Sequence, residues 1–134
     1  MFPKNTWYVA CTPDEFADKP LGRRICGERM VFYRNGEGRV AALEDFCPHR
    51  GAPLSLGRVC EGQLTCGYHG LVMGCDGRTV SMPGQRVERF AAIRSFPVVE
   101  RHGFVWVWPG EAAKADVAQV PDFEWSDSPD WAYG

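Results

Sequence analysis

Two short segments, each holding a cysteine close to a histidine, constrain the fold more than any other feature of the sequence. The first reads Cys47-Pro48-His49 and the second reads Cys66-Gly67-Tyr68-His69, so the pattern is C-x-H, sixteen residues, then C-x-x-H. Glycine and proline surround both segments, which is typical of tight loops. If the four side chains bind one common group, the chain must fold so that the two loops meet.

Two thiolates and two imidazoles can hold a [2Fe–2S] cluster in which both histidines bind the same iron. Two ferric ions, two sulfides and two thiolates have no net charge, whereas four thiolates would leave two negative charges. Because an electron is added more easily to a neutral cluster, we expect a potential of roughly −150 to +300 mV, against about −400 mV for plant-type ferredoxins. Gly51, Gly67 and Gly70 would let backbone N–H groups approach the sulfides. The predicted cofactor and metal ligands are Cys47, His49, Cys66 and His69.

Other interpretations of these residues stay open. The same four side chains could bind zinc tetrahedrally, although zinc loops usually supply C-x-x-C or H-x-x-x-H pairs. The six cysteines also allow a disulfide framework, but a chain of this length does not need one. We expect the four cysteines outside the motif to be unpaired thiols in or near the core: Cys11, Cys26, Cys60 and Cys75. His102 is expected at the surface, and Arg50 is either a solvated charge or a partner contact.

Composition limits the classes of function. The 134 residues fit a single domain that can build its own core. The 15 basic and 17 acidic residues give a net charge of −2 and form no basic run, so we expect no nucleic-acid partner. No apolar stretch reaches the ~18 residues that a membrane span requires. The first seven residues do not resemble a signal peptide, so we expect a cytoplasmic protein that does not bind membranes.

The pattern of apolar residues predicts an all-β fold of small antiparallel sheets. A short helix is expected to begin at Thr12, with Glu15 reaching back to the capping residue. Residues 35–38, Asn-Gly-Glu-Gly, predict a hairpin turn. In the segment 104–108, tryptophans alternate with valines, so both faces of this strand are expected to be buried. Strands are predicted over residues 6–11, 24–26, 30–33, 40–43, 63–65, 71–73, 79–82, 96–100 and 104–108.

The motifs resemble those of the Rieske non-haem iron oxygenases, in particular their aromatic O-demethylating and ring-hydroxylating members. The likeness extends over all 134 residues. It is carried by Cys-Pro-His-Arg-Gly-Ala-Pro-Leu-Ser (47–55), Cys-Gly-Tyr-His-Gly-Leu (66–71), Asn-Thr-Trp-Tyr-Val-Ala (5–10), Phe-Val-Trp-Val-Trp-Pro-Gly (104–110) and Trp-Ala-Tyr-Gly (131–134). Respiratory Rieske proteins have a further cysteine in each loop. Ala52 and Tyr68 stand at those places here, which favours the oxygenase and ferredoxin class.

The resemblance implies a Rieske fold with the [2Fe–2S] cluster held between two loops. It implies a separate reductase with flavin and its own iron–sulfur cluster, which passes electrons through this domain to a mononuclear non-haem Fe(II). It also implies a homotrimer, in which the cluster of one subunit serves the iron of its neighbour. His69 would pass the electron to a bridging carboxylate across that interface.

The resemblance further implies a division of the chain into a Rieske domain over residues 1–110 and a tail over 111–134 that leads to an absent catalytic domain. The catalytic domain of such oxygenases binds iron through two histidines and one carboxylate. Only His102 is left for that task here, so we expect no catalytic residue within this chain. The alternative is a free-standing Rieske ferredoxin that only carries electrons. The substrate-contacting residues would lie outside the sequence.

Overall fold

The computed structural model describes residues 5–16, 19–48, 51–67, 70–82, 84, 86, 90, 92–111 and 114–115. Within them the chain forms ten short strands and two single turns of 3₁₀ helix, η1 (Pro13–Phe16) and η2 (Leu54–Leu56). No helix in this part of the chain is long and apolar enough to cross a membrane.

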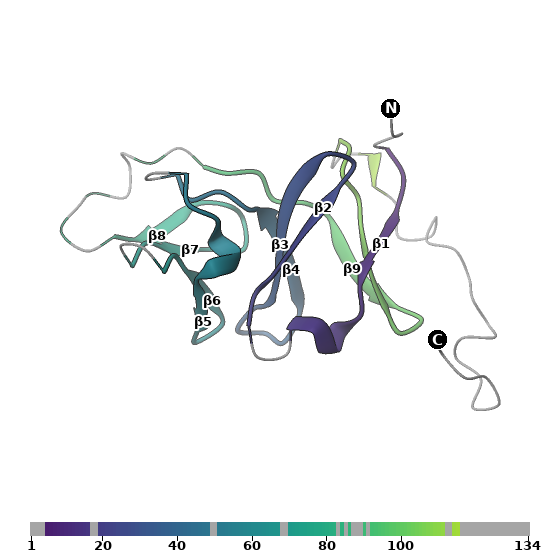
Figure 1. Cartoon of the computed structure of the whole chain (residues 1–134), viewed down its shortest axis with the longest axis horizontal. Coiled ribbons are helices and arrows are strands. Elements are labelled where there is room, and N and C mark those ends of the chain that lie inside the picture. Colours follow the sequence, from purple (N-terminus) through teal and green to yellow (C-terminus); the bar gives the residue numbers. More distant parts are fainter. Residues whose placement is uncertain are drawn as a thin grey trace.

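The strands form three small antiparallel sheets, as predicted (Figure 1). Sheet A has the order β1 (Tyr8–Cys11), β10 (Phe104–Val107), β9 (Val98–Arg101). Sheet B consists of β2 (Leu21–Ile25), β3 (Glu28–Arg34) and β4 (Val40–Glu44). Sheet C consists of β5 (Arg58–Cys60), β6 (Gln63–Thr65), β7 (Val72–Met73) and β8 (Thr79–Ser81).

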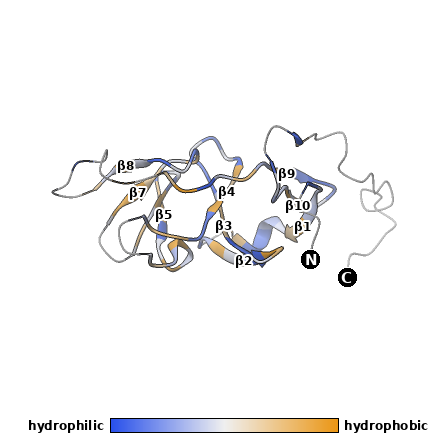
Figure 2. Ribbon diagram, turned by 90° about the horizontal axis from the view of Figure 1, so that it is seen from above, coloured by the Kyte–Doolittle hydropathy of each residue, from blue (hydrophilic) through white to orange (hydrophobic). Residues whose placement is uncertain are grey.

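Sheet B lies between the other two sheets, and its strands β3 and β4 have buried residues on both faces (Figure 1). Met30 and Phe32 of β3 pack into the hydrophobic cluster shared with sheet A. Val31 and Tyr33 pack into the cluster shared with sheet C. Successive side chains of a strand point to opposite faces, so a strand covered on both sides is a continuous apolar run. Figure 2 shows such hydrophobic segments, in orange, in β4 and β7.

The two faces of β10 are buried as the sequence predicted. Val105 and Val107 join the cluster between sheets A and B. Trp106 and Trp108 lie on the opposite face with Trp7, whose ring centroid is 5.4 Å from that of Trp108 in an edge-to-face arrangement. The indole N–H of Trp108 donates to the carbonyl of Glu111 at 2.9 Å, which ties the end of sheet A to the segment that follows it.

The predicted capping contact and the predicted hairpin turn are both found in the structure. The backbone N–H of Thr12 donates to the Glu15 carboxylate at 2.8 Å, but the predicted helix is a single 3₁₀ turn. The predicted hairpin over 35–38 joins β3 to β4. A second hairpin was missed between β2 and β3. Cys26 and Gly27 both have positive φ there (53° and 78°), so β2 ends and β3 begins earlier than predicted.

Arg94 connects the end of the described domain to β4. Its backbone N–H donates to the carboxylate of Glu44 at 3.1 Å, and its carbonyl accepts from the Glu44 N–H at 2.7 Å. The Arg94 guanidinium lies 4.6 Å from the ring centroid of Phe96 and donates to the carbonyls of Pro109 and Gly110. One side chain thus holds the point at which the chain leaves sheet A.

A second arginine joins sheets A and B. The Arg34 guanidinium on β3 donates to both carboxylate oxygens of Glu100 on β9, at 2.5 and 3.0 Å. Arg34 also donates to the Gly38 carbonyl at 2.9 Å and lies 5.3 Å from the ring centroid of Phe16. The hydrogen bonds from Arg34 lower the pKa of Glu100.

We predict that Glu100→Gln lowers the free energy of unfolding at pH 7 by about 0.5 kcal/mol, a modest loss because the two side chains are 38% and 33% exposed. Since the pKa of Glu100 is lowered in the folded state, its contribution is present above the unfolded-state value of about 4.3 and disappears as pH falls through the folded-state pKa. Urea unfolding at pH 7 and pH 3 measures this difference. Glu37→Gln, in the exposed β3–β4 turn, is the control, and an equal loss in both variants would contradict the prediction.

Candidate metal centre

The loop after β4 turns back on itself around Cys47. The backbone N–H of Cys47 donates to the carbonyl of Ala52 at 2.8 Å. The carbonyl of Cys47 in turn accepts from the N–H of Gly51 at 2.7 Å. Gly51 has φ of 77°, a conformation that residues with a Cβ rarely adopt. These two hydrogen bonds close a turn that begins at the cysteine.

The loop between β6 and β7 repeats this geometry around Cys66. The Cys66 N–H donates to the carbonyl of Leu71 at 2.8 Å, and the Cys66 carbonyl accepts from the Gly70 N–H at 3.1 Å. Gly70 has φ of 79°. Donor, acceptor and positive-φ glycine stand at the same offsets from the cysteine in both loops. The two predicted thiol ligands therefore occupy equivalent positions in two turns of the same design.

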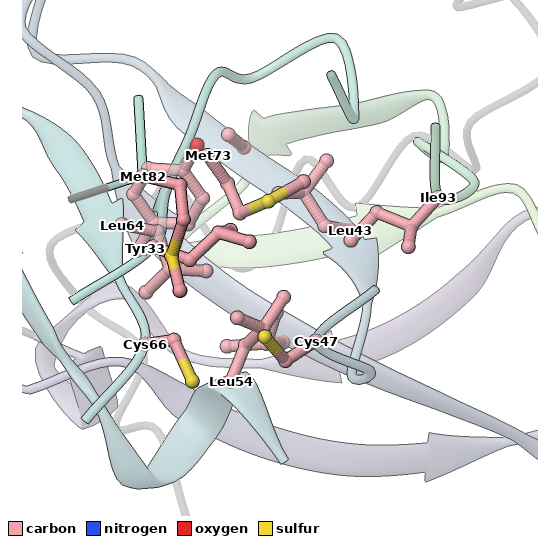
Figure 3. Close-up of a cluster of buried hydrophobic side chains, with 12 residues drawn as sticks. Tyr33, Leu43, Cys47, Leu54, Leu64, Cys66, Met73, Met82 and Ile93 are labelled. Carbon is pink, nitrogen blue, oxygen red and sulfur yellow. The ribbon is translucent and has the colours of Figure 1, made fainter. Parts of the chain in front are cut away.

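Both thiols enter the core between sheets B and C. Cys47 and Cys66 are each 2% exposed and belong to one hydrophobic cluster. Figure 3 shows the two side chains beside Leu54 of η2, each coming from a different loop. The structure thus brings together the two cysteines that lie 19 positions apart in the sequence.

A close backbone crossing holds the two loops together. A Cβ on Gly57 would lie 2.0 Å from the carbonyl oxygen of Thr65, and a Cβ on Gly67 would lie 3.1 Å from the carbonyl oxygen of Leu56. The chain leaving η2 therefore passes directly against the entrance of the second loop. Only glycine fits at position 57, because any side chain would push the two segments apart.

A buried carboxylate fixes the end of the first loop. Asp45 is 7% exposed, and its two carboxylate oxygens accept from the Ser55 N–H at 2.8 Å and from the Ser55 hydroxyl at 2.6 Å. A Cβ on Gly22 of β2 would lie 2.8 Å from the Ser55 hydroxyl oxygen, so a glycine is needed there too. Sequence reasoning did not identify Asp45, Ser55 or Gly22, because their roles depend on contacts between distant segments.

The surroundings of the two thiols are apolar. Tyr33, in the same cluster, has a buried hydroxyl with no hydrogen-bond partner among the described residues, and burial raises the pKa of this phenol. Charge is costly to bury in such a place. A cluster with two thiolates and two neutral imidazoles has no net charge when oxidised, whereas one with four thiolates would place two negative charges beside this core. The apolar surroundings of the two thiols therefore favour a bound group with little net charge.

Some predicted residues lie outside the described part of the chain: His49, Arg50, Tyr68, His69 and the tail from residue 116 onward. Within the described part, no group of three or more His, Cys, Asp or Glu residues is placed to hold a metal. The histidine half of the predicted ligand set stays a prediction. His102 lies half-buried in the turn between β9 and β10.

The other cysteines differ partly from expectation. All six are described, and none forms a disulfide. Cys11 is buried in the cluster between sheets A and B, where burial raises the pKa of its thiol to about 11. Cys26 is half-buried. Cys60 and Cys75 are exposed, so their predicted place in or near the core was wrong, because Cys60 ends β5 beside a turn of sheet C and Cys75 lies in the turn between β7 and β8.

Comparisons with known proteins identify this kind of site. The family model for the Rieske [2Fe-2S] domain matches residues 6–97. The oxygenase subunit of vanillate O-demethylase from Pseudomonas sp. (strain HR199 / DSM 7063) is 69% identical over 134 residues, which are 100% of this chain and 38% of that protein. The oxygenase component of dicamba O-demethylase from Stenotrophomonas maltophilia is 49% identical over 124 residues, which are 91% of this chain and 37% of that protein.

Solved structures agree with these relatives. The crystal structure of apo dicamba monooxygenase superimposes with a TM-score of 0.88 at 48% identity, over 96% of this chain and 40% of that one. The predicted likeness to the Rieske non-haem iron oxygenases is confirmed, and the oxygenase subunit of vanillate O-demethylase is among the similar proteins. The chain spans about 38% of the length of the first curated relative it matches.

We predict that Gly57→Ala separates the two cysteine loops, because the new methyl group would overlap the Thr65 carbonyl. Overpacking of this kind costs about 1–3 kcal/mol, and we expect the free energy of unfolding to fall by that amount. Denaturant titration measures the loss, and iron bound per chain reports the loop geometry. Gly36→Ala is the control, since its nearest neighbour would be 3.6 Å away. Normal stability and iron content in Gly57→Ala would show that the crossing does not hold the loops.

Proposed function

Because the chain belongs to the Rieske [2Fe–2S] domain family, we propose that Cys47, His49, Cys66 and His69 hold its [2Fe–2S] cluster and that the domain transfers single electrons. One observation carries the proposal. The cysteines of both family motifs lie at equivalent positions of two matching turns, buried in one core. The cluster, when bound, supplies a one-electron carrier of higher potential than a plant-type ferredoxin.

The residues around the loops have supporting roles. Gly57 and Gly67 set how closely the loops approach each other. The carboxylate of Asp45 holds Ser55 and so orients η2 beneath the first loop. The apolar cluster excludes water from the cysteine side, which lowers the local dielectric and favours a cluster without net charge.

We further propose that the chain is the electron-input part of an aromatic O-demethylating or ring-hydroxylating oxygenase. The relatives are oxygenase subunits or components of that kind, and this chain matches less than half of their length. The proposal includes a Rieske domain over residues 1–110 and a tail over 111–134 that leads toward a catalytic domain with a mononuclear Fe(II). A flavin and iron–sulfur reductase, a homotrimer and a cytoplasmic setting belong to the same proposal. The relatives' names favour it over a free-standing ferredoxin.

We predict that Cys47→Ser and Cys66→Ser abolish cluster assembly, because each removes one of two buried thiol ligands. Cys60→Ser and Cys75→Ser are matched controls, since these exposed thiols lie outside the motif. Iron, sulfide and zinc are assayed on anaerobically purified protein, and EPR is recorded after dithionite reduction. Two irons, two sulfides and the low-average-g signal of mixed ligation are expected for the wild type and for both controls.

Zinc in place of iron, or a cluster that survives loss of Cys47, would overturn the ligand assignment. Replacing His49 or His69 by Cys tests the imidazole ligands. If the variant still binds a cluster, the added negative charge should lower its potential toward the value of about −400 mV seen with four thiolates. An unchanged potential would exclude that histidine as a ligand.

The wider role is tested by adding the catalytic part. We expect a polypeptide that continues this chain with the catalytic portion of an O-demethylating relative to demethylate a methoxylated aromatic acid when O2, NADH and a reductase are supplied. The 134-residue chain alone should accept electrons without turnover. Turnover by the chain alone would contradict the division of labour proposed here.

A further inference from the structure

One end of sheet B is left uncovered on the face that carries the cysteine loops. Arg29 precedes Val31 by two positions on β3, so both side chains belong to the face that packs against sheet C. Val31 is fully buried, whereas Arg29 is exposed. On β2, Arg24 is the cross-strand partner of Arg29 and is exposed as well. Two guanidinium groups therefore stand at paired positions at the edge of the covered area.

This arrangement is unfavourable by itself, since like charges directly opposite each other on neighbouring strands repel. The charged neighbours have other partners. Arg23 pairs with Glu15 at 2.5 Å, and the Asp45 carboxylate accepts two hydrogen bonds from Ser55. Among the described residues, neither Arg24 nor Arg29 has an ion-pair partner within 4 Å. Arg24 and Arg29 thus place two positive charges side by side on the surface of a chain whose net charge is −2.

The arginine pair lies next to the first cysteine loop. Two surface cavities, of about 330 and 230 Å³, share Arg24, Arg29 and Asp45 in their walls. The first cavity extends to Leu56 of η2, which is 79% exposed, and the second extends to Phe46, which is 39% exposed and directly precedes Cys47. η2 contacts both β2 and β3. The second cavity also includes Glu28 and Glu44, and the Glu44 carboxylate accepts from the N–H of Arg94.

We propose that Arg24, Arg29, Leu56 and Phe46 form the docking surface for an acidic electron-donor protein. The inference rests on the proposed electron-transfer function and names the partner's chemistry and place. Carboxylates on the partner would relieve the repulsion between the two arginines and steer the encounter. The exposed Leu56 and Phe46 would supply apolar surface from which water is displaced on docking. An electron arriving here would enter beside the loop that holds Cys47.

The test uses a plant-type [2Fe–2S] ferredoxin as the acidic donor. Binding of oxidised ferredoxin is measured by calorimetry, and stopped-flow absorbance follows reduction of the chain by photoreduced ferredoxin, at low and high salt. For the double variant Arg24→Glu/Arg29→Glu, we expect affinity and second-order rate to fall by about tenfold or more at low salt, with a weaker salt dependence. Leu56→Ser should weaken binding and leave the salt dependence unchanged.

Arg39→Glu is the matched control. It reverses one arginine, which is half of the charge change in the double variant, at the β3–β4 turn on the other end of sheet B, and it should change both quantities by less than about twofold. Dithionite reduction and the EPR signal show that the cluster is intact in each variant. If the wild type assembles no cluster, the electron-transfer function fails, while calorimetry still decides the docking surface. Unchanged binding in the double variant, or an equal effect of Arg39→Glu, would overturn the docking proposal. A difference in oligomeric state between the wild type and the double variant, measured by light scattering, would also overturn the docking proposal, because the surface would then join copies of the chain.

Discussion

The contact between the backbone at Gly57 and the Thr65 carbonyl is the constraint on which the site depends. Each cysteine loop is a local turn closed by its own hydrogen bonds, and these bonds do not determine where the other turn lies. The crossing supplies that relation, because it places the exit of the first loop on the entrance of the second. Asp45 and Ser55 then fix the end of η2, so that Cys47 and Cys66 share one core.

The rest of the fold serves as a support for this pair of loops. Sheet B is rigid because it is packed on both faces, with sheet A on one side and the loop-bearing sheet C on the other. The Arg34–Glu100 pair joins sheets A and B where their strands come together. Any movement of sheet B relative to its neighbours would therefore disrupt the packing of both hydrophobic clusters.

The sequence predicted those features that local chemistry determines. The Cys-x-His and Cys-x-x-His segments, the capping pair Thr12 and Glu15, and the two-faced strand over 104–108 each carry their signal within a few residues. Strand β5 was missed because Arg58–Cys60 has a single apolar residue between an arginine and a cysteine. The roles of Gly22, Asp45 and Gly57 were not predicted, because they depend on contacts with segments that are distant in the sequence.

Arg94 has a consequence for how such a domain can be recombined. Its guanidinium holds the carbonyls of Pro109 and Gly110, while its backbone is bonded to Glu44, three positions before Cys47. Arg94 thereby fixes the direction of the chain at Pro109 and Gly110 relative to the first cysteine loop. A chimaera joined after Gly110 would keep these contacts and so the direction in which the chain leaves sheet A. One joined before Arg94 would lose them, and the two parts would be coupled only by the length of their linker.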